Sequence, residues 1–386
     1  MAHHDAIVVG LGAAGSAALY QLAKRGAKVL GIDRFAPPHD LGSSHGATRI
    51  TRLAIGEGVH YTPLAMRSHE IWREIERETG RTLLTQNGGL VISSAQTRAV
   101  THVSGFFQNT VAAARKFGIA HELLNADEIR KRFPQFNVQD GEKGYYEPAA
   151  GFVRPEACIA AELELAQKRG AKIVTGETMK SFEEAGDGVH LTTDKGTYGA
   201  AKVILAIGAW LPPILPSEIA RLFKIHRQVL YWFDVENRGA YPPERFPIFI
   251  WEPRDSKQGI YGFPAIDEFG MKIATEQYAI ETTPRDVIRK VAQSETDHMY
   301  EAHVASNFKG VKPSCLRAVT CLYTVTPDAG FVIDRLPGSD RVILASPCSG
   351  HGFKHSSAIG EALAELALDG RSPHDLSAFR LDRFGA

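Results

Sequence analysis

The sequence predicts an α/β fold into which a second domain, of the α+β class with an antiparallel sheet, is inserted. Between residues 6 and 33 an apolar strand, a glycine-rich turn, a helix and another strand follow one another. Between residues 227 and 275, short apolar segments are separated by turns rich in Pro, Gly and Asp, as in antiparallel sheets. Strand-then-helix order returns between residues 321 and 368, so we expect the C-terminal segment to complete the N-terminal fold.

Length, charge and cysteine content narrow the class of protein. The 386 residues are enough for two to three domains at roughly 150 residues each. Because 44 basic side chains balance 44 acidic ones, we expect neither nucleic acid nor a membrane surface as a partner. No apolar run approaches the roughly 18 residues that span a bilayer, and we expect a cytoplasmic protein. The four cysteines form no CxxC pair and no Cys/His cluster, which argues against a disulfide framework or a metal site.

The opening segment has the pattern of a Rossmann-like dinucleotide site. The apolar strand 6–9 is followed directly by Gly10-Leu11-Gly12-Ala13-Ala14-Gly15. In such a turn the first glycine makes the sharp bend, the second lets the backbone approach a pyrophosphate, and the third lets the helix pack close to the sheet. The phosphates lie at the helix N-terminus, where free N–H groups and the positive end of the helix dipole attract anions.

An acidic residue follows at the position expected for a ribose contact. The helix 16–25 stops at Gly26, and the next strand, 28–32, ends at Asp33. A carboxylate at this place accepts hydrogen bonds from both ribose hydroxyls and repels a 2′-phosphate. The segment therefore argues against NADP and leaves NAD and FAD open.

The segment 42–52, rich in glycine and polar residues, is expected to be a loop that covers a ligand. We call it and the residues directly after it the arginine loop. Pro37 and Pro38 stop the preceding strand, and the loop brings His45, Arg49 and Arg52 together. Two arginines and a histidine close together in a loop are, by themselves, most often a solvent-exposed surface patch without a binding role. Loops at the carboxyl ends of dinucleotide-binding strands carry the site, however, which favours a role in binding.

The remaining pattern alternates helices and strands in two blocks. We expect helices at 63–78, 95–117, 125–133, 155–169, 284–300 and 353–368. We expect strands at 90–92, 172–174, 188–193, 201–207, 227–233, 248–251, 259–263, 271–275, 321–324, 331–334 and 342–345. The strand 201–207 is apolar and ends in Gly-Ala-Trp, which lets backbone approach a ligand closely. From this order of helices and strands we predict two domains. A cofactor-binding domain comprises residues 1–85, 150–225 and 320–386, and a substrate domain comprises residues 86–149 and 226–319.

Five motifs, in order, carry a resemblance to a known family. They are Gly10-x-Gly12-x-x-Gly15, the loop Gly42 to Arg52, Tyr261-Gly262-Phe263-Pro264 with Met271-Lys272-Ile273, Cys321 to Asp328, and Ser349-Gly350-His351-Gly352-Phe353-Lys354. Across nearly its whole length the chain resembles the monomeric sarcosine oxidase and N-methyltryptophan oxidase family. These are flavin amine oxidases with a D-amino-acid-oxidase-like fold. The resemblance implies a monomer that binds FAD, an amino-acid substrate and oxygen.

The resemblance also implies how FAD is held. It places a covalent bond between the flavin 8α-methyl group and the sulfur of Cys321, and it places His45 and Arg49 against the flavin ring, where cations stabilise negative charge. We expect the other three cysteines to be structural. The residues that the resemblance assigns to the cofactor are Gly10, Gly12, Gly15, Asp33, Arg34, Ser43, Thr48, Cys321, Gly350, Gly352 and Lys354.

For the substrate, the resemblance makes Arg52 and Lys354 a carboxylate clamp, which suits a bidentate guanidinium and a point-charge ammonium. It makes Lys272 hold a water against flavin N5 and assist oxygen reduction. Tyr261 and Tyr323 form the aromatic walls of the pocket. The residues expected to act in catalysis are Lys272, Arg49, His45 and Tyr323, and those expected to bind substrate are Arg52, Lys354, Tyr261 and Glu276.

The chain departs from the family pattern at a few positions near this pocket. The sarcosine-type enzymes have a histidine four residues after the active-site lysine, whereas this chain has Glu276. Leu53 and Ile55 replace polar and aromatic residues in the arginine loop, and Trp251-Glu252 precedes the pocket strand. An acid in this pocket favours a larger or more cationic substrate than sarcosine.

We therefore expect an FAD oxidase of secondary N-methyl amino acids. The clamp fixes the carboxylate, the N-methyl carbon faces flavin N5, and a hydride equivalent passes to the flavin. Hydrolysis of the imine gives formaldehyde and the primary amino acid, and oxygen becomes hydrogen peroxide. Three alternatives remain open: an oxidase of a cyclic imino acid such as pipecolate or proline, or of a bulky N-substituted amino acid; a flavin dehydrogenase with another electron acceptor; and a non-catalytic FAD-binding protein.

Overall fold

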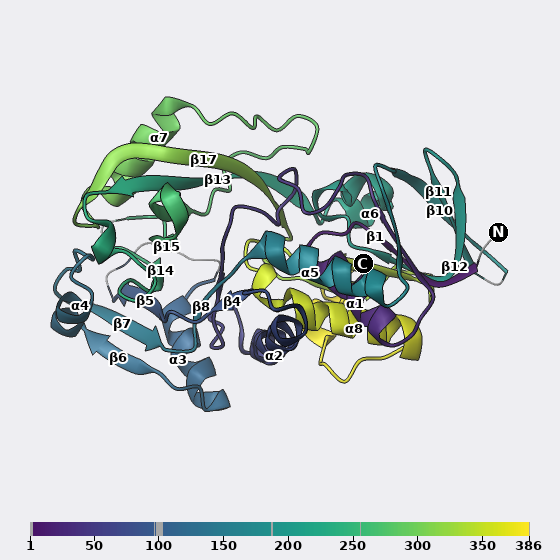
Figure 1. Ribbon diagram of the computed structural model, residues 1–386, viewed down its shortest axis with the longest axis horizontal. Helices are drawn as coiled ribbons and strands as arrows, with labels where there is room; N and C mark the ends of the chain where they lie inside the picture. The colour runs from purple at the N-terminus through teal and green to yellow at the C-terminus, as the bar shows by residue number, and fades with distance from the viewer. Residues whose placement is uncertain (1–2, 96, 98–102, 187, 255, 386) are drawn as a thin grey trace.

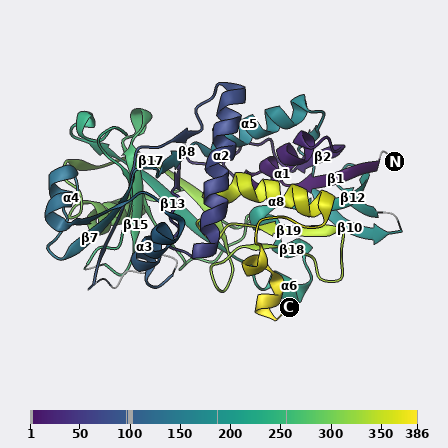
Figure 2. The same ribbon diagram turned by 90° about the horizontal axis from the view of Figure 1, so that it is seen from below.

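Two large sheets at opposite ends of the molecule organise the fold, with the helix α2 (Thr62–Thr79) between them (Figures 1 and 2). The computed structural model describes residues 3–95, 97, 103–186, 188–254 and 256–385. Within these ranges each large sheet has eight strands, and a third sheet of three strands lies beside them. No helix of these ranges is long and apolar enough to cross a bilayer.

The first sheet has the order β10-β11-β12-β1-β2-β9, and β19 and β18 extend it from β12. β9, β2, β1, β12 and β19 run parallel to one another. Its strands are β1 (His3–Val9), β2 (Val29–Asp33), β9 (Lys172–Thr175), β10 (Met179–Ala185), β11 (Gly188–Thr193), β12 (Thr197–Leu205), β18 (Val332–Arg335) and β19 (Val342–Ser346). The central residues of these strands are apolar and buried, at 6–9 in β1, 29–32 in β2, 203–205 in β12 and 342–345 in β19, whereas β9 begins and ends with the exposed Lys172 and Thr175.

Three helices, α1 (Ala13–Lys24), α5 (Pro155–Lys168) and α8 (Ser356–Asp369), pack on one another beside this sheet (Figure 2). α1 contacts both of the others. Small residues allow the close approach: a Cβ added at Gly360 would lie 2.4 Å from the backbone of Ala17. The short helix α6 (Ser217–Ala220) follows β12.

The second sheet has the order β17-β13-β16-β15-β14-β5-β7-β6 and is antiparallel except between β14 and β5. Its strands are β5 (Gly89–Ser94), β6 (Glu122–Asn125), β7 (Glu142–Glu147), β13 (Lys224–Val235), β14 (Ile248–Trp251), β15 (Ile260–Ala265), β16 (Met271–Thr275) and β17 (Val311–Val325). The helices around it are α3 (Phe106–Phe117), α4 (Ala126–Arg132) and α7 (Gln293–Met299). A buried aromatic cluster centred on Phe136 forms its core.

A small sheet connects the two halves. Its strands are β3 (Arg49–Thr51), β8 (Gly151–Val153) and β4 (Leu84–Thr85). β3 belongs to the predicted arginine loop, so this sheet fixes the end of that loop. The predicted domain boundaries at residues 85, 149 and 225 fall near passages between the sheets, whereas the boundary at 319 falls within β17 of the second sheet, and the division into domains remains a prediction.

Most predicted elements are present, and the exceptions have physical reasons. The helix predicted at 284–300 is wrong for 284–292, because carbonyls of this segment accept hydrogen bonds from outside it: Arg227 donates to Ile288, and Thr320 donates to Arg289. The helix predicted from residue 95 begins at Phe106, and the part that concerns residues 96 and 98–102 lies outside the described residues. β10 was not predicted, and β13 and β17 are longer than predicted since they pair with each other along their length.

Candidate functional site

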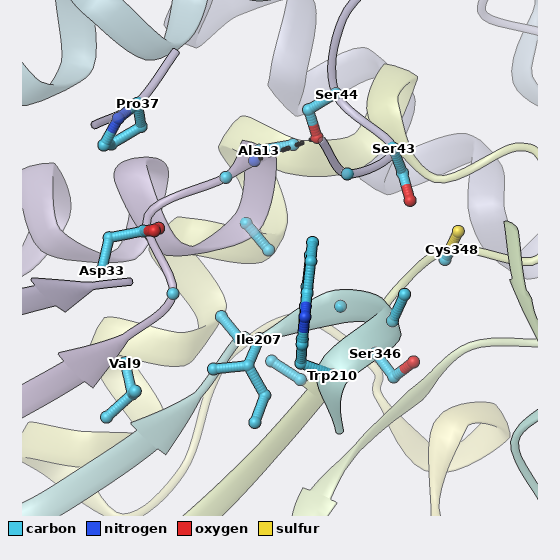
Figure 3. Close-up of a pocket in the computed structure, with 18 of the residues that line it drawn as sticks. Val9, Ala13, Asp33, Pro37, Ser43, Ser44, Ile207, Trp210, Ser346 and Cys348 are labelled. Atoms are coloured by element: carbon cyan, nitrogen blue, oxygen red, sulfur yellow. Dashed lines mark hydrogen bonds between the residues drawn. The ribbon is translucent and has the colours of Figure 1, made fainter. Parts of the chain in front are cut away.

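A large cavity opens at the carboxyl ends of β1, β2, β12 and β19, and Figure 3 shows its interior. In open parallel sheets this edge is where ligands bind. Its lining comes from the β1–α1 turn, the end of β2 with the loop that follows, the segment after β12 and the segment after β19. The residues labelled in Figure 3 are Val9, Ala13, Asp33, Pro37, Ser43, Ser44, Ile207, Trp210, Ser346 and Cys348.

The glycine turn is built as the motif predicts. Gly10 has a φ of +84°, and a Cβ there would lie 2.6 Å from the carbonyl oxygen of Ala206. A Cβ at Gly15 would lie 1.8 Å from the carbonyl oxygen of Gly10, so only glycine lets α1 approach the turn. Gly12 caps α1 without a side-chain hydrogen bond and lines the cavity. The N–H of Ala13 donates to the Ser44 hydroxyl (3.4 Å), and the N–H groups that follow it in the first turn of α1 are available to an anion in the cavity.

Asp33 lies at the cavity edge with a fixed carboxylate. One oxygen accepts a hydrogen bond from the N–H of Leu11 (2.7 Å) and the other from the N–H of Phe35 (2.8 Å). Each oxygen keeps a second lone pair for a ribose hydroxyl. The guanidinium of Arg34 lies over the ring of Trp210, with 5.5 Å between its central carbon and the ring centroid.

The remaining lining suits the flat ring system of a dinucleotide. This lining is mostly apolar. It includes Gly352, where only glycine fits, since a Cβ there would lie 1.7 Å from the carbonyl oxygen of Pro347. With the α1 N-terminus in the middle and Asp33 at one end, these residues fit FAD. Gly350 and Ser43, which we expect to bind the cofactor, also line the cavity.

Lys272 anchors the arginine loop beneath the cavity. Its ammonium, on β16, is buried and donates to the carbonyl oxygens of Gly46 (2.7 Å) and Thr48 (2.8 Å) and to the Thr48 hydroxyl (3.1 Å). Arg49 donates to the carbonyl oxygens of Ser43 (2.8 Å) and Thr48 (2.9 Å). Burial, followed by the charge of Arg49, holds the pKa of Lys272 well below its usual range.

His45 lies in the same loop, and its charge differs from the expectation. Burial, with a smaller contribution from Arg49, lowers its pKa to about 3, so the ring is neutral at neutral pH. Its Nε2 atom is buried and has no hydrogen-bond partner among the described residues. The positive charge that we expected from both side chains is therefore carried by Arg49.

The two cysteines near the cavity differ in position. Cys321, on β17, is completely buried, and Cys348 is the cysteine that lines the large cavity. Burial raises the pKa of the Cys321 thiol, while the charges of Arg49 and Lys272 act in the opposite direction. Next to Cys321, β17 is hydrogen-bonded to the arginine loop: the N–H of Leu322 donates to the carbonyl oxygen of Gly42 (3.3 Å). The flavin bond predicted for Cys321 remains a prediction.

A small cavity adjoins the large one, and the two share Arg49, Tyr323, Gly350 and Phe353. Lys272 and Phe263 form part of its wall. The predicted substrate residues Tyr261, Glu276 and Lys354 line it, together with Glu57. We call the part of the large cavity that carries these four shared residues its flavin end, and a ligand in the small cavity lies beside it.

The structure brings the two predicted clamp residues onto a single carboxylate. Arg52 donates to one oxygen of Glu57 (2.5 Å), and Lys354 donates to the other (3.0 Å). All three side chains are almost completely buried. Burial lowers the pKa of Lys354 to about 8, and Glu57 opposes this shift. Our sequence reasoning missed Glu57; its one signal is an acid between two glycines just after Arg52.

Two tyrosine hydroxyls and an acid also belong to the lining of the small cavity. The hydroxyls of Tyr261 and Tyr323 are 3.1 Å apart, and burial raises the pKa of both. Glu276 follows β16 directly, and the hydroxyl of Tyr278 donates to it (3.3 Å).

Fold and site together define a flavin-dependent oxidoreductase, and comparison with known proteins gives the family. Residues 5–366 match the family described as FAD dependent oxidoreductase, and the chain belongs to it. Monomeric sarcosine oxidase from Streptomyces avermitilis is 40% identical over 387 residues, which cover 99% of this chain and 98% of that protein. N-methyl-L-tryptophan oxidase from Yersinia pestis is 34% identical over 387 residues, which cover 99% of both.

A solved structure supports the fold independently. The open form of NikD, an unusual amino acid oxidase, matches with a TM-score of 0.84 and 24% identity, and the match covers 98% of both chains. The predicted resemblance, the flavoenzyme fold and the FAD cofactor are thereby confirmed. The chain is an FAD-dependent enzyme of the amine oxidase type.

Proposed function

We propose that this enzyme oxidises an N-methyl amino acid. The substrate, oxygen and water are converted into the primary amino acid, formaldehyde and hydrogen peroxide. The observation that supports this most is that Arg52 and Lys354 contact one carboxylate, that of Glu57, which lines the small cavity together with Lys354. The names of the two relatives, sarcosine oxidase and N-methyl-L-tryptophan oxidase, agree with such a substrate.

Each side chain then has a defined task. Arg52 and Lys354 bind the substrate carboxylate. Their guanidinium and ammonium groups replace water molecules as the hydrogen-bond donors to this carboxylate. Tyr261 and Tyr323 enclose the amine end and limit the entry of water. FAD, when bound, accepts the hydride equivalent and returns the electrons to oxygen. Lys272 lines the small cavity, where its ammonium, held by the carbonyl oxygens of Gly46 and Thr48, stabilises negative charge that develops on oxygen.

The stoichiometry of the products tests this proposal. The purified FAD-loaded protein is offered a panel of N-methyl amino acids, and peroxide and formaldehyde are measured together. We expect one formaldehyde for each peroxide. Peroxide without formaldehyde would contradict demethylation and favour oxidation of a ring carbon, as in a cyclic imino acid; flavin reduction without peroxide would favour a dehydrogenase.

Covalent attachment through Cys321 is part of the proposal. The charges of Arg49 and Lys272 support it, because they oppose the rise that burial causes in the pKa of the Cys321 thiol. After denaturation we expect the yellow colour to stay with the polypeptide in the Cys348→Ser variant and to be released in Cys321→Ser. Release from Cys348→Ser alone would instead assign the bond to the cysteine that lines the cavity.

We also propose that the enzyme acts as a monomer in the cytoplasm. The balanced charge of the chain supports the absence of a nucleic-acid or membrane partner. Light scattering in solution and cell fractionation test the two statements, and a dimeric mass or a membrane-bound fraction would contradict them.

A further inference from the structure

A row of four side chains crosses the second sheet at the level of Lys272. Lys272 of β16 lies opposite Phe263 of β15 on one side and opposite Trp232 of β13 on the other. Trp232 in turn lies opposite Arg317 of β17. Residues directly opposite one another on adjacent strands point to the same face of a sheet, so the four side chains form one row across it. Aromatic and cationic side chains alternate along this row.

The two aromatic rings of the row contact the ammonium of Lys272. Its Nζ atom lies 4.5 Å from the centroid of the Phe263 ring and 5.1 Å from that of the Trp232 ring. Its hydrogen-bond acceptors, the two carbonyl oxygens of Gly46 and Thr48 and the Thr48 hydroxyl, are neutral. A cation within about 6 Å of a ring centroid is attracted to the ring, most strongly to that of tryptophan. Because Lys272 is buried, water screens this attraction little.

Charged and titratable groups of several elements also act on this ammonium. They are Arg49 of β3, Glu156 of α5, Cys321 and Arg317 of β17 and His45 of the arginine loop. Burial and the two arginines lower the pKa of Lys272, whereas Glu156 and Cys321 raise it. The Glu156 carboxylate accepts hydrogen bonds from the backbone N–H groups of Gly46 (2.6 Å) and Ala47 (3.1 Å). The charges thus act in opposite directions, and the aromatic rings add to those that favour the ammonium.

Arg317 contacts the same indole from another strand. Its guanidinium carbon lies 4.9 Å from the centroid of the Trp232 ring and 4.8 Å from that of the Phe269 ring. Since β13 lies between β16 and β17 in the sheet, Lys272 and Arg317 reach Trp232 from its two neighbouring strands. Arg317 is only partly buried and belongs to the edge strand. The row therefore connects the wall of the small cavity with the edge of the sheet.

We propose that Trp232 is a positioning residue for Lys272 and that Arg317 tunes its charge. The indole holds the ammonium at the wall of the small cavity in its charged form, and Arg317 opposes this form because it is a like charge beside the same ring. Phe263 lines the small cavity with Lys272 and completes the aromatic contact. The inference rests on the proposed function for the task of Lys272 in oxygen reduction and deepens it by naming what controls that lysine.

The protonation of Lys272 can be measured directly in the FAD-loaded protein. Lysine labelled with carbon-13 at the ε-carbon gives an NMR signal that shifts when the amine loses its proton, and the signal missing from Lys272→Met belongs to Lys272. In Trp232→Leu we expect the midpoint of this titration to fall by about one pH unit, since the buried cation loses an aromatic partner. Trp232→Phe keeps a ring and should lie between Trp232→Leu and the unmodified protein. An unchanged midpoint in Trp232→Leu would overturn the inference.

Arg317 provides a test of the opposite sign. Arg317→Gln removes a like charge, so the midpoint of Lys272 should rise. A loss of packing alone would not move the midpoint in opposite directions from the two sides of one ring. Phe233→Leu is the matched control, because Phe233 follows Trp232 in β13 but packs into the aromatic core on the other face. A fall in Arg317→Gln, or a shift in Phe233→Leu equal to that in Trp232→Leu, would contradict the assignment.

Reoxidation by oxygen separates this inference from the proposed function. The reduced variants are mixed with oxygen over a range of pH, and we expect the rate to decline at a lower pH in Trp232→Leu and at a higher pH in Arg317→Gln than in the unmodified protein. NMR midpoints that shift as expected, with reoxidation unchanged, would retain the inference for the row and overturn the task proposed for Lys272. Reoxidation that is slow in Lys272→Met, with a titration that neither variant moves, would overturn the inference and leave the proposed function standing.

Discussion

At the scale of single residues, Glu57 determines how the two cations of the clamp are arranged. It accepts from Arg52 and from Lys354 at once, and its negative charge opposes the fall that burial causes in the pKa of Lys354. A substrate carboxylate must replace Glu57 or share these donors. The motif predicted both cations, but the acid between them has no sequence signature, and only the fold reveals it.

Lys272 is the residue on which oxygen reactivity is expected to depend. Lys272→Met removes a buried cation and should slow reoxidation of the reduced enzyme by oxygen at least about a hundredfold. Stopped-flow mixing of the reduced protein with oxygen measures this rate. Lys312→Met is the control, because Lys312 forms an exposed pair with Asp234 away from both cavities. Unchanged reoxidation in Lys272→Met would mean that the lysine only holds the loop.

Lys354 makes carboxylate binding depend on pH. Its pKa of about 8 means that the ammonium loses its proton as the pH rises through that value. The affinity for hexanoate, which stays ionised in this range, should fall between about pH 7 and about pH 9. Titrations that follow flavin absorbance measure it. Lys354→Met should bind weakly at every pH, and a similar pH dependence in this variant would assign the titration to another group.

At the scale of elements, an acid joins the three helices beside the cofactor sheet. Glu162 of α5 accepts from Ser16 of α1 (2.8 Å) and from Ser357 of α8 (2.8 Å). All of these side chains are buried. Burial raises the pKa of Glu162 from 4.5 to about 7, and the two hydroxyls reduce the shift. The helix that offers its N-terminus to the phosphates is therefore packed on a group that titrates near neutrality.

This acid should make stability fall as the pH rises. The pKa is higher in the folded than in the unfolded state, so the stabilisation is complete below about pH 4.5 and is lost as the pH passes about 7. We expect the free energy of unfolding to fall by up to about 3 kcal/mol between these limits. Glu162→Gln should remove this dependence in denaturant titrations, whereas Glu164→Gln, an exposed acid of the same helix, should keep it. A pH dependence retained in Glu162→Gln would contradict the account.

Sequence reasoning located the elements where local pattern and tertiary packing agree. The apolar spacing of residues 63–78 predicted α2, and Pro155 with Gly170 predicted the limits of α5. Residues 284–292 also have helical spacing, but their carbonyls bond to Arg227 and Thr320 instead. Such contacts come from distant parts of the chain, which is why local pattern did not reveal them.

At the scale of the whole molecule, the site is assembled from segments far apart in the sequence. Arg52 and Glu57 come from the N-terminal quarter, Glu276 and Lys272 from the antiparallel sheet, and Lys354 from the C-terminal segment. The motifs could predict which residues belong to the site, because each motif is local. They could not predict the neutral ring of His45, the position of Cys348 or the contact through Glu57, since these depend on packing between segments.

The central claim is that Arg52 and Lys354 hold the carboxylate of the substrate beside the flavin. The most direct test is a crystal structure of the FAD-loaded protein with bound hexanoate. We predict that the ligand carboxylate lies within hydrogen-bond distance of both Arg52 and Lys354, on the side of the cavity that faces the flavin. A carboxylate bound elsewhere, with Glu57 still joining the two cations, would contradict the account.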